Sequence, residues 1–311
     1  MFDIPTYPEF RELQREDQRR FERYFHRPVP RSGSEGGNPP VASDYTFTNF
    51  YTWRHSECSR VSCVHNNTVI YAAPKGRAPF FFMPLGTGKI AETLLTCAEY
   101  MRSRKETPRF NFLTADMVKQ HFGPPYRIEE QRANFDYVYR QDRLVALSGR
   151  KFDGKRNRLK KFLKNHSYTY QPLTSEYIAQ CVTLLEIWNR IRQPVSEEFP
   201  KLREEKHAVI ETLVNFEWLK LRGGMILVGG KVEAFSIGEA LNPNTLVTYI
   251  EKSNPEMEGL AQLINREFAR HAAAGFTYIN REDDLGEPGL RRAKMSYYPD
   301  HFIHKYAALL P

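Results

Sequence analysis

Three strand-like runs follow one another closely in the second half of the chain, and they limit its fold more than any other feature. The runs cover residues 224–228, 231–239 and 245–251. Only Gly229 and Gly230 separate the first two runs, and a two-glycine connection is typical of a tight hairpin, so this pair should be antiparallel. A helical pattern at 258–273 and a short strand at 277–280 come next. The sequence therefore predicts an antiparallel meander, a helix and a further strand.

The first half of the chain repeats this order. Strands are expected at 62–64, 68–72, 79–84, 110–113 and 136–139, with a helix at 90–101. Two further helices, 174–192 and 203–219, precede the meander, and a last strand is expected at 301–307. We expect an α+β fold with a duplicated architecture of mixed, mainly antiparallel sheets flanked by helices, although the halves show no sequence match. The stretch 27–43, dense in Gly, Pro and Ser, is predicted to be a loop.

The 311 residues exceed one small module and suggest two domains. No run approaches the ~18 apolar residues of a membrane span, and the N-terminus lacks the apolar segment of a signal peptide, so a soluble, cytoplasmic protein is expected. Four scattered cysteines indicate neither a disulfide framework nor a zinc ribbon. His301 and His304 lie three apart without a set of further ligands, and no metal site is predicted.

The positive charge is concentrated in one segment. The net charge is +8, and residues 150–164 carry eight Lys or Arg and a single Asp, whereas the residues after them are slightly acidic. This segment should form a helix from about Gly154, with Asp153 as its cap and an apolar stripe of Leu159, Phe162 and Leu163. Its cations suggest a phosphate-binding face, and the alternative is a solvated interdomain helix whose lysine stems cover apolar surface.

The densest polar cluster lies at 278–299. It begins as a strand, continues through charged residues, turns at Gly286 and restarts as a helix at Pro288. Its charged or polar members are Asn280, Arg281, Glu282, Asp283, Asp284, Arg291, Arg292 and Lys294. Loops after strands are where α/β folds place ligand groups, so this cluster is the main candidate site. The alternative is an ion-pair network that braces a loop.

Two carboxylates stand at the ends of neighbouring strands. Glu239 and Glu251, the latter followed by Lys252, could orient an amine or act as a general base. They could instead pair with Arg281 or Arg291. Further on, Gly259 opens a strand–loop–helix turn of the kind that binds anions, although acidic residues flank it.

Several segments together resemble a known family. They are FTNFYTWR, LSGRKFDGKRNRLKKF, FSIGEAL, YIEKSNPEMEGLAQLINREFA and INREDDLGEPGLRRAKMSYYP. They resemble an uncharacterised bacterial family related to the C-terminal domain of phosphatidylglycerol lysyltransferases. The resemblance implies two tandem acetyltransferase-like (GNAT-type) domains, similar to those of the Fem aminoacyltransferases, with an aminoacyl-tRNA as the donor. We expect an N-terminal domain at 1–147, a basic linker helix at 148–170 and a C-terminal domain with the active site at 171–311.

The resemblance and the residue patterns together assign expected roles. Glu239, Glu282 and Asp284 would hold the donor ammonium or assist proton transfer, and Arg291, the fourth catalytic residue, would contact a phosphate, carboxylate or oxyanion. Glu251, Lys252, Gly259, Asn280, Arg281 and Lys294 would bind the donor, and Arg156, Arg158, Lys160 and Lys161 would bind the tRNA phosphates. No covalent nucleophile is required, because positioning and oxyanion stabilisation can supply much of the rate.

Two departures from the family pattern leave alternatives open. No multi-span membrane region delivers a lipid acceptor, so the acceptor is left open among a small molecule, a peptide and a lipid, and peripheral membrane contact stays open. The coenzyme A loop of acetyltransferases reads Gln/Arg-x-x-Gly-x-Gly/Ala, whereas this chain has Glu256, Gly259 and Ala261 there, with the first charge reversed. A coenzyme A thioester-dependent N-acyltransferase and a catalytically inactive binding protein remain the competing hypotheses.

Overall fold

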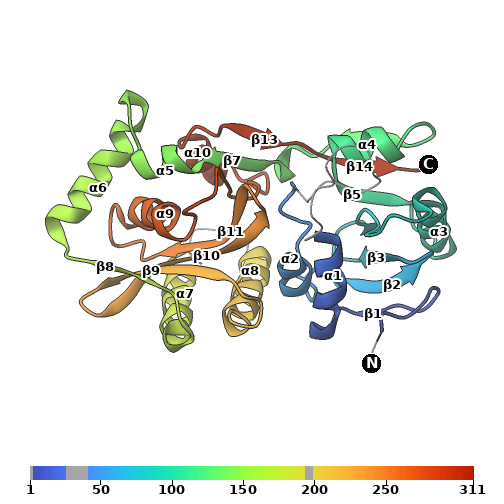
Figure 1. Ribbon diagram of the computed structural model, residues 1–311, viewed down its shortest axis with the longest axis horizontal. Helices are drawn as coiled ribbons and strands as arrows, with labels where there is room; N and C mark the ends of the chain where they lie inside the picture. The colour runs from blue at the N-terminus through green and yellow to red at the C-terminus, as the bar shows by residue number, and fades with distance from the viewer. Residues whose placement is uncertain (1–2, 26–40, 193–198) are drawn as a thin grey trace. The chain divides into compact units, whose positions relative to one another are not determined.

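The computed structural model describes residues 3–25, 41–192 and 199–311, in two compact units (Figure 1). Unit 1 comprises Met1–Asp136, Asp283–Pro288 and Phe302–Pro311, and unit 2 comprises Tyr137–Glu282 and Gly289–His301. The two units interleave along the chain. Most of the loop predicted at 27–43, residues 26–40, lies outside the described residues.

A seven-stranded sheet forms the body of unit 1, in the order β1-β2-β3-β4-β5-β14-β6. Its strands are β1 (Arg11–Glu12), β2 (Arg60–Val64), β3 (Asn67–Ala72), β4 (Phe80–Phe81), β5 (Arg109–Thr114), β6 (Arg127–Glu130) and β14 (Lys305–Leu309). The helices of this part are α1 (Gln18–Phe25), α2 (Phe47–Thr52), α3 (Ile90–Ser103) and α4 (Ala115–His121). Strands β2, β3 and β4 pair antiparallel, and β4 then pairs parallel with β5.

A second seven-stranded sheet has the order β13-β7-β12-β11-β10-β9-β8. Its strands are β7 (Asp136–Arg140), β8 (Thr169–Pro172), β9 (Arg222–Val228), β10 (Lys231–Asn242), β11 (Thr245–Ser253), β12 (Tyr278–Asn280) and β13 (His301–Ile303). The helices are α5 (Gln141–Ala146), α6 (Asp153–Asn165), α7 (Ile178–Arg192), α8 (Phe199–Val214), α9 (Leu260–His271) and α10 (Pro288–Met295). The predicted antiparallel hairpin is confirmed: Lys231 pairs with Val228 across the turn.

The two sheets share one order of elements. In each, three antiparallel strands lead into a helix and then into a strand parallel to the third, as β2-β3-β4-α3-β5 and β9-β10-β11-α9-β12. The parallel strand is then flanked by an antiparallel strand from a distant part of the chain, β14 beside β5 and β7 beside β12. The predicted fold class, two acetyltransferase-like assemblies of mixed and mainly antiparallel sheets with flanking helices, is confirmed.

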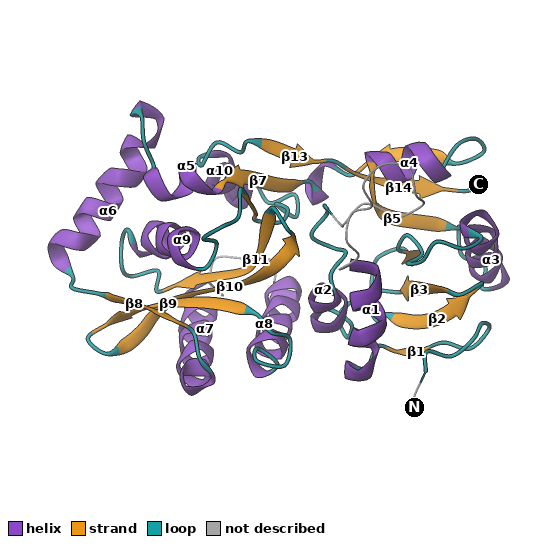
Figure 2. Ribbon diagram, viewed as in Figure 1, coloured by secondary structure: helices purple, strands orange, loops and turns teal. Residues whose placement is uncertain are grey.

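Helices cover both faces of the sheet in unit 2 (Figure 2). Helix α9 packs on β9, β10 and β11, whereas α7 packs on β10 and β11 from the other face and also contacts α8. Ile237 and Leu263 are fully buried in this core, and each such side chain contributes roughly 1.5–3 kcal/mol through the water it excludes. The sheet of unit 2 therefore has two faces that different helices cover, so a side chain on one face is separated by the sheet from a side chain on the other.

The basic segment forms α6 as predicted, with Leu159 and Phe162 buried. The predicted cap was wrong: Phe152 is the N-cap residue, and Asp153 lies in the first turn, where it pairs with Arg156. Leu163 is exposed, so the apolar stripe is narrower than expected. This narrow stripe packs α6 against α9.

Candidate active site

The sheet of unit 2 opens between β11 and β12. The two strands pair only from Thr245 to Val247 on β11, because β12 ends at Asn280 while β11 continues to Ser253. A register shift between β10 and β11 makes Tyr249 the additional residue of a β-bulge in β11, next to this point. Bulges of this kind often re-aim side chains near active sites. The gap is where the polar residues after β12 meet those of β11.

Arg281 bridges this gap. Its Nη2 lies 3.1 Å from Oε1 of Glu251, and Oε2 of Glu251 accepts a hydrogen bond from Asn265 on α9 at 3.0 Å. The guanidinium lies between two tyrosine rings, with its Cζ 5.6 Å from the centroid of Tyr139 and 5.1 Å from that of Tyr297. Its Nη1 is buried and has no hydrogen-bond partner. An unsatisfied buried donor is rare in proteins, and it marks this guanidinium as a candidate ligand group.

The backbone around Arg281 is held from α10 and from the strand itself. The Lys294 ammonium donates to the carbonyl of Arg281 at 2.5 Å, and the Tyr139 hydroxyl donates to the carbonyl of Lys294 at 2.8 Å. Asn280, fully buried, accepts from the amide of Glu282, which adopts a positive φ of 55°. Asn280 and Lys294 thus fix the position of Arg281, which explains why polar residues cluster here in the sequence.

One cation of α6 reaches the same place. Lys155 donates to Oγ of Ser296 at 2.6 Å, and its Nζ lies 4.0 Å from the centroid of the Tyr297 ring. Burial, followed by the charges of Arg158 and Arg281, lowers the pKa of Lys155 to about 8. The basic helix and the segment after β12 are therefore in contact within unit 2. Sequence analysis missed Lys155, although its spacing to Leu159 and Phe162 places it on the inward face of the helix.

The turn before α9 is covered by α6. Gly259 has a φ of 94°, and a Cβ atom on it would stand 2.2 Å from the backbone oxygen of Arg158. Beside it, Lys161 of α6 forms an ion pair with Glu258. Close helix backbone and two acids, Glu256 and Glu258, thus occupy the place where a pyrophosphate would have to lie. The turn does not fit the phosphates of coenzyme A.

The remaining cations of α6 divide into two kinds. Arg156 donates to the backbone carbonyls of Leu147 and Gly149, so it holds the chain before the helix. Arg158 and Lys160 are exposed. These exposed cations, with Lys161, form the candidate phosphate face.

Two of the predicted site residues lie on the opposite face of the sheet. Neighbouring residues on a strand point to opposite faces, so Lys252 faces away from Glu251. Lys252 contacts Glu205 of α8 at 2.8 Å, and its Nζ lies 3.5 Å from the centroid of the Trp188 ring of α7. Glu239 shares that face, because it is four residues along β10 from Phe235, which pairs with Lys252. The structure therefore brings together Glu251, Asn280, Arg281 and Lys294, whereas Gly259 lies against α6 and Glu239 and Lys252 lie on the other face.

Asp284 belongs to unit 1 and is fully buried there. It pairs with Arg132 at 3.1 Å, and its Oδ1 accepts from the amide of Gly286 at 2.9 Å. These contacts stabilise the turn before α10, as in the loop-bracing alternative. Glu282 and Arg291 are both partly exposed and belong to unit 2.

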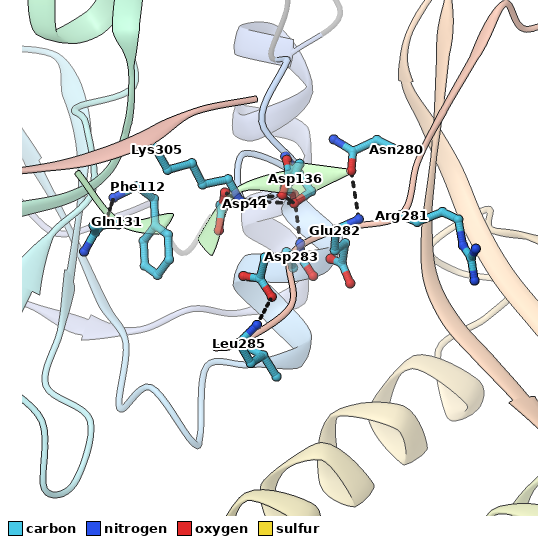
Figure 3. A network of polar contacts seen from close by, with 12 residues as sticks. Asp44, Phe112, Gln131, Asp136, Asn280, Arg281, Glu282, Asp283, Leu285 and Lys305 are labelled. Atoms are coloured by element: carbon cyan, nitrogen blue, oxygen red, sulfur yellow. Dashed lines mark hydrogen bonds and ion pairs between the residues drawn. The ribbon is translucent and has the colours of Figure 1, made fainter. Parts of the chain in front are cut away.

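A buried charge cluster in unit 1 has no counterpart in the sequence analysis (Figure 3). Nζ of Lys305 lies 2.6 Å from Asp136 and 2.5 Å from Asp44, and Ser43 donates to Asp136 through both its amide and its hydroxyl. Burial raises the pKa of Asp44 to about 7, even though Lys305 acts against the shift. The cluster links three segments that are far apart in the sequence, and no local sequence pattern predicts it.

A family model described as phosphatidylglycerol lysyltransferase, C-terminal, matches residues 39–309. The chain belongs to this family. The predicted family resemblance is thereby confirmed. No curated protein matches the chain in sequence.

Solved structures support the same fold. A conserved protein of unknown function from Bacteroides thetaiotaomicron is 28% identical, with a TM-score of 0.84, over 97% of this chain and 99% of that one. The L-PGS structure from Bacillus licheniformis is 15% identical, with a TM-score of 0.61, over 99% of this chain and 93% of that one. FemX is 9% identical, with a TM-score of 0.54, over 97% of both chains. The family indicates an acyltransferase of the lysyltransferase type, and the neighbours show that the fold is shared.

None of the helices in the described residues combines the length and apolar character that crossing a membrane requires. Within the same residues, no group of three or more His, Cys, Asp and Glu side chains is arranged to hold a metal ion.

Proposed function

We propose that this family member transfers an amino acid from an aminoacyl-tRNA to an acceptor, at the gap between β11 and β12. The observation that carries the proposal is the guanidinium of Arg281, which is fixed by Glu251 through one nitrogen and keeps its other terminal nitrogen without a partner. A preorganised donor of this kind suits the oxygen that becomes negative when an ester carbonyl is attacked.

The adjoining helix suits the carrier. A tRNA presents a phosphate backbone, and the exposed cations Arg158 and Lys160 lie on the same helix as Lys155, which contacts Ser296 beside the gap. An anionic carrier bound along α6 would bring its 3′ end toward Arg281. Charged tRNA is a cytoplasmic molecule, so we place the protein in the cytoplasm.

The misfit of coenzyme A favours this donor over a thioester. In acetyltransferases the helix N-terminus after the third meander strand binds pyrophosphate, and here α6 and the acids beside Gly259 occupy that region. FemX and the L-PGS from Bacillus licheniformis have the same fold, and the donor and acceptor of this chain are inferred from its own site. The acceptor is left as a small nucleophile, a peptide or a lipid.

The test is protein-dependent consumption of charged tRNA. A panel of tRNAs, each charged with one radiolabelled amino acid, is incubated with the protein and an extract of small molecules, peptides and lipids, and the label is followed from tRNA to product. We expect one or a few amino acids to move, and we expect Arg281→Met to abolish the transfer. Label that moves equally with the Arg281→Met variant, or thermal protection by coenzyme A thioesters but not by charged tRNA, would overturn the proposal.

A further inference from the structure

Transfer of an aminoacyl group from an ester to a nucleophile requires a proton to move. The carboxylate nearest Arg281 is that of Glu251. Glu251 uses Oε1 for Arg281 and Oε2 for Asn265. Both oxygens of this carboxylate therefore already accept hydrogen bonds from protein groups. Glu239 lies on the other face of the sheet and accepts from the Tyr249 hydroxyl at 2.5 Å.

Lys155 has the placement that these carboxylates lack. It is half-buried on α6, and its Nζ is anchored by Ser296 at 2.6 Å and lies over the ring of Tyr297. The same ring lies 5.1 Å from the guanidinium carbon of Arg281. The Tyr297 ring thus contacts both the amine of Lys155 and the guanidinium of Arg281, so the two groups belong to one site.

We propose that Lys155 is the proton-transfer residue of this site, an inference that rests on the proposed function. In the reaction, a lone pair of the attacking amine or hydroxyl bonds to the ester carbonyl carbon. The neutral amine of Lys155 takes the proton from that attacking group. The carbonyl carbon–ribose oxygen bond then breaks, and the ribose oxygen leaves with the proton returned by the Lys155 ammonium. No group is oxidised or reduced, and the lysine ends as it began.

The surroundings make this role chemically reasonable. An exposed lysine is almost fully protonated near neutral pH. Burial and the charges of Arg158 and Arg281 lower the pKa of Lys155 to about 8, although the Glu251 carboxylate acts against the shift. A substantial fraction is then neutral at physiological pH, which is the condition for general-base catalysis. Ser296 is a positioning residue, because its hydroxyl also donates to the carbonyl of Ala293 at 2.6 Å and so fixes the amine.

The experiment measures single-turnover transfer from saturating charged tRNA between pH 6 and 9.5. For the unaltered protein we expect a rate that rises with pH and levels off with a midpoint near 8. Lys155→Arg keeps the charge but titrates far higher, so we expect a loss of about 100-fold at pH 7.5 and no midpoint near 8. Lys155→Gln should show the same loss. Binding of charged tRNA to both variants should change by less than about threefold.

Two controls keep the outcomes apart. Lys231→Met removes an exposed lysine at the start of β10, elsewhere in unit 2, and should leave the profile unchanged. Ser296→Ala should slow transfer by about tenfold, since the amine loses its anchor, and it should lower the midpoint, since the Ser296 hydroxyl accepts a hydrogen bond from the protonated amine. If Lys155→Arg retains the midpoint near 8, the titrating group is the acceptor itself, and this inference is wrong while the transferase proposal stands. If the unaltered protein consumes no charged tRNA, the proposed function itself fails.

Discussion

Arg281 and Glu251 form an ion pair at 3.1 Å across the gap where β12 has ended and β11 continues. Both side chains are mostly withdrawn from water, with 12% and 20% of their surfaces exposed. The pair therefore replaces strand pairing at this point, and it also aims the guanidinium into the candidate site. The ion pair between Arg281 and Glu251 therefore contributes both to stability and to the proposed chemistry. Matched variants are needed to separate these two contributions.

Replacing Glu251 with Gln should destabilise the protein by roughly 3 kcal/mol, because it leaves the Arg281 charge buried without a counter-ion. Urea unfolding followed by circular dichroism measures this loss. Glu256→Gln is the matched control, since Glu256 is exposed in the following loop, and it should change stability by no more than about 0.5 kcal/mol. Equal effects of the two substitutions would show that the pair contributes nothing to stability.

Cations of α6 should differ in their effect on tRNA binding. Lys160→Ala removes an exposed charge, so it should lower affinity for charged tRNA and reduce the slope of log K against log salt by about one. Arg156→Ala removes contacts to the Leu147 and Gly149 carbonyls, so it should lower the thermal midpoint instead. Fluorescence titration with charged tRNA at several salt concentrations measures the binding slope of each variant, and thermal unfolding measures the midpoint. An unchanged slope for Lys160→Ala contradicts the assignment of the phosphate face.

The Asp44 carboxyl should make stability fall as pH rises. Its folded pKa of about 7 lies above the unfolded value near 3.9. Between these values the folded state binds a proton that the unfolded state has lost, so the unfolding free energy decreases as the pH rises. Asp44→Asn removes this titration. It should match the unaltered protein at pH 4 and be more stable at pH 8, as measured by urea unfolding at each pH. A variant that is less stable at pH 8 would show that the ion pair with Lys305 outweighs burial.

Gly259 should not tolerate a side chain. Gly259→Ala requires a positive φ of a non-glycine residue and places a methyl group against the Arg158 backbone, so a loss of about 2 kcal/mol or more is expected. Gly154→Ala on α6 is the control, because a Cβ there meets nothing within 4 Å and alanine favours a helix by up to about 1 kcal/mol. Differential scanning calorimetry should therefore show midpoints that move in opposite directions. A Gly259→Ala protein as stable as its parent would mean that α6 does not lie against this turn.

Much of the fold could be predicted from local patterns. Gly229-Gly230 marks the hairpin, and the helical spacing of Leu159 and Phe162 marks α6. The sequence allows Glu251 either a role toward the donor amine or a pairing with Arg281 or Arg291, and the choice depends on which face of the sheet its carboxylate occupies. The bulge at Tyr249 and the early end of β12 set that geometry, and neither has a clear signature in the sequence.

Other features could not be predicted because they join distant segments. Lys305, Asp136 and Asp44 come from three parts of the chain, and each looks like an ordinary surface charge in its own stretch. The exchange of β7 and β14 between the sheets is equally non-local. Lys155 is different, since its helical phase relative to Leu159 and Phe162 already placed it on the inward face of a basic helix.

The measurement that tests the central claim most directly is photo-crosslinking with a tRNA charged with a photoreactive phenylalanine analogue, mapped by mass spectrometry. The account places the reactive end of the donor beside Arg281 in unit 2. It therefore predicts that the aminoacyl group labels peptides containing Lys155, Tyr139 or Tyr297, and that excess charged tRNA suppresses the labelling. Adducts confined to other peptides, or labelling that charged tRNA does not suppress, would contradict it.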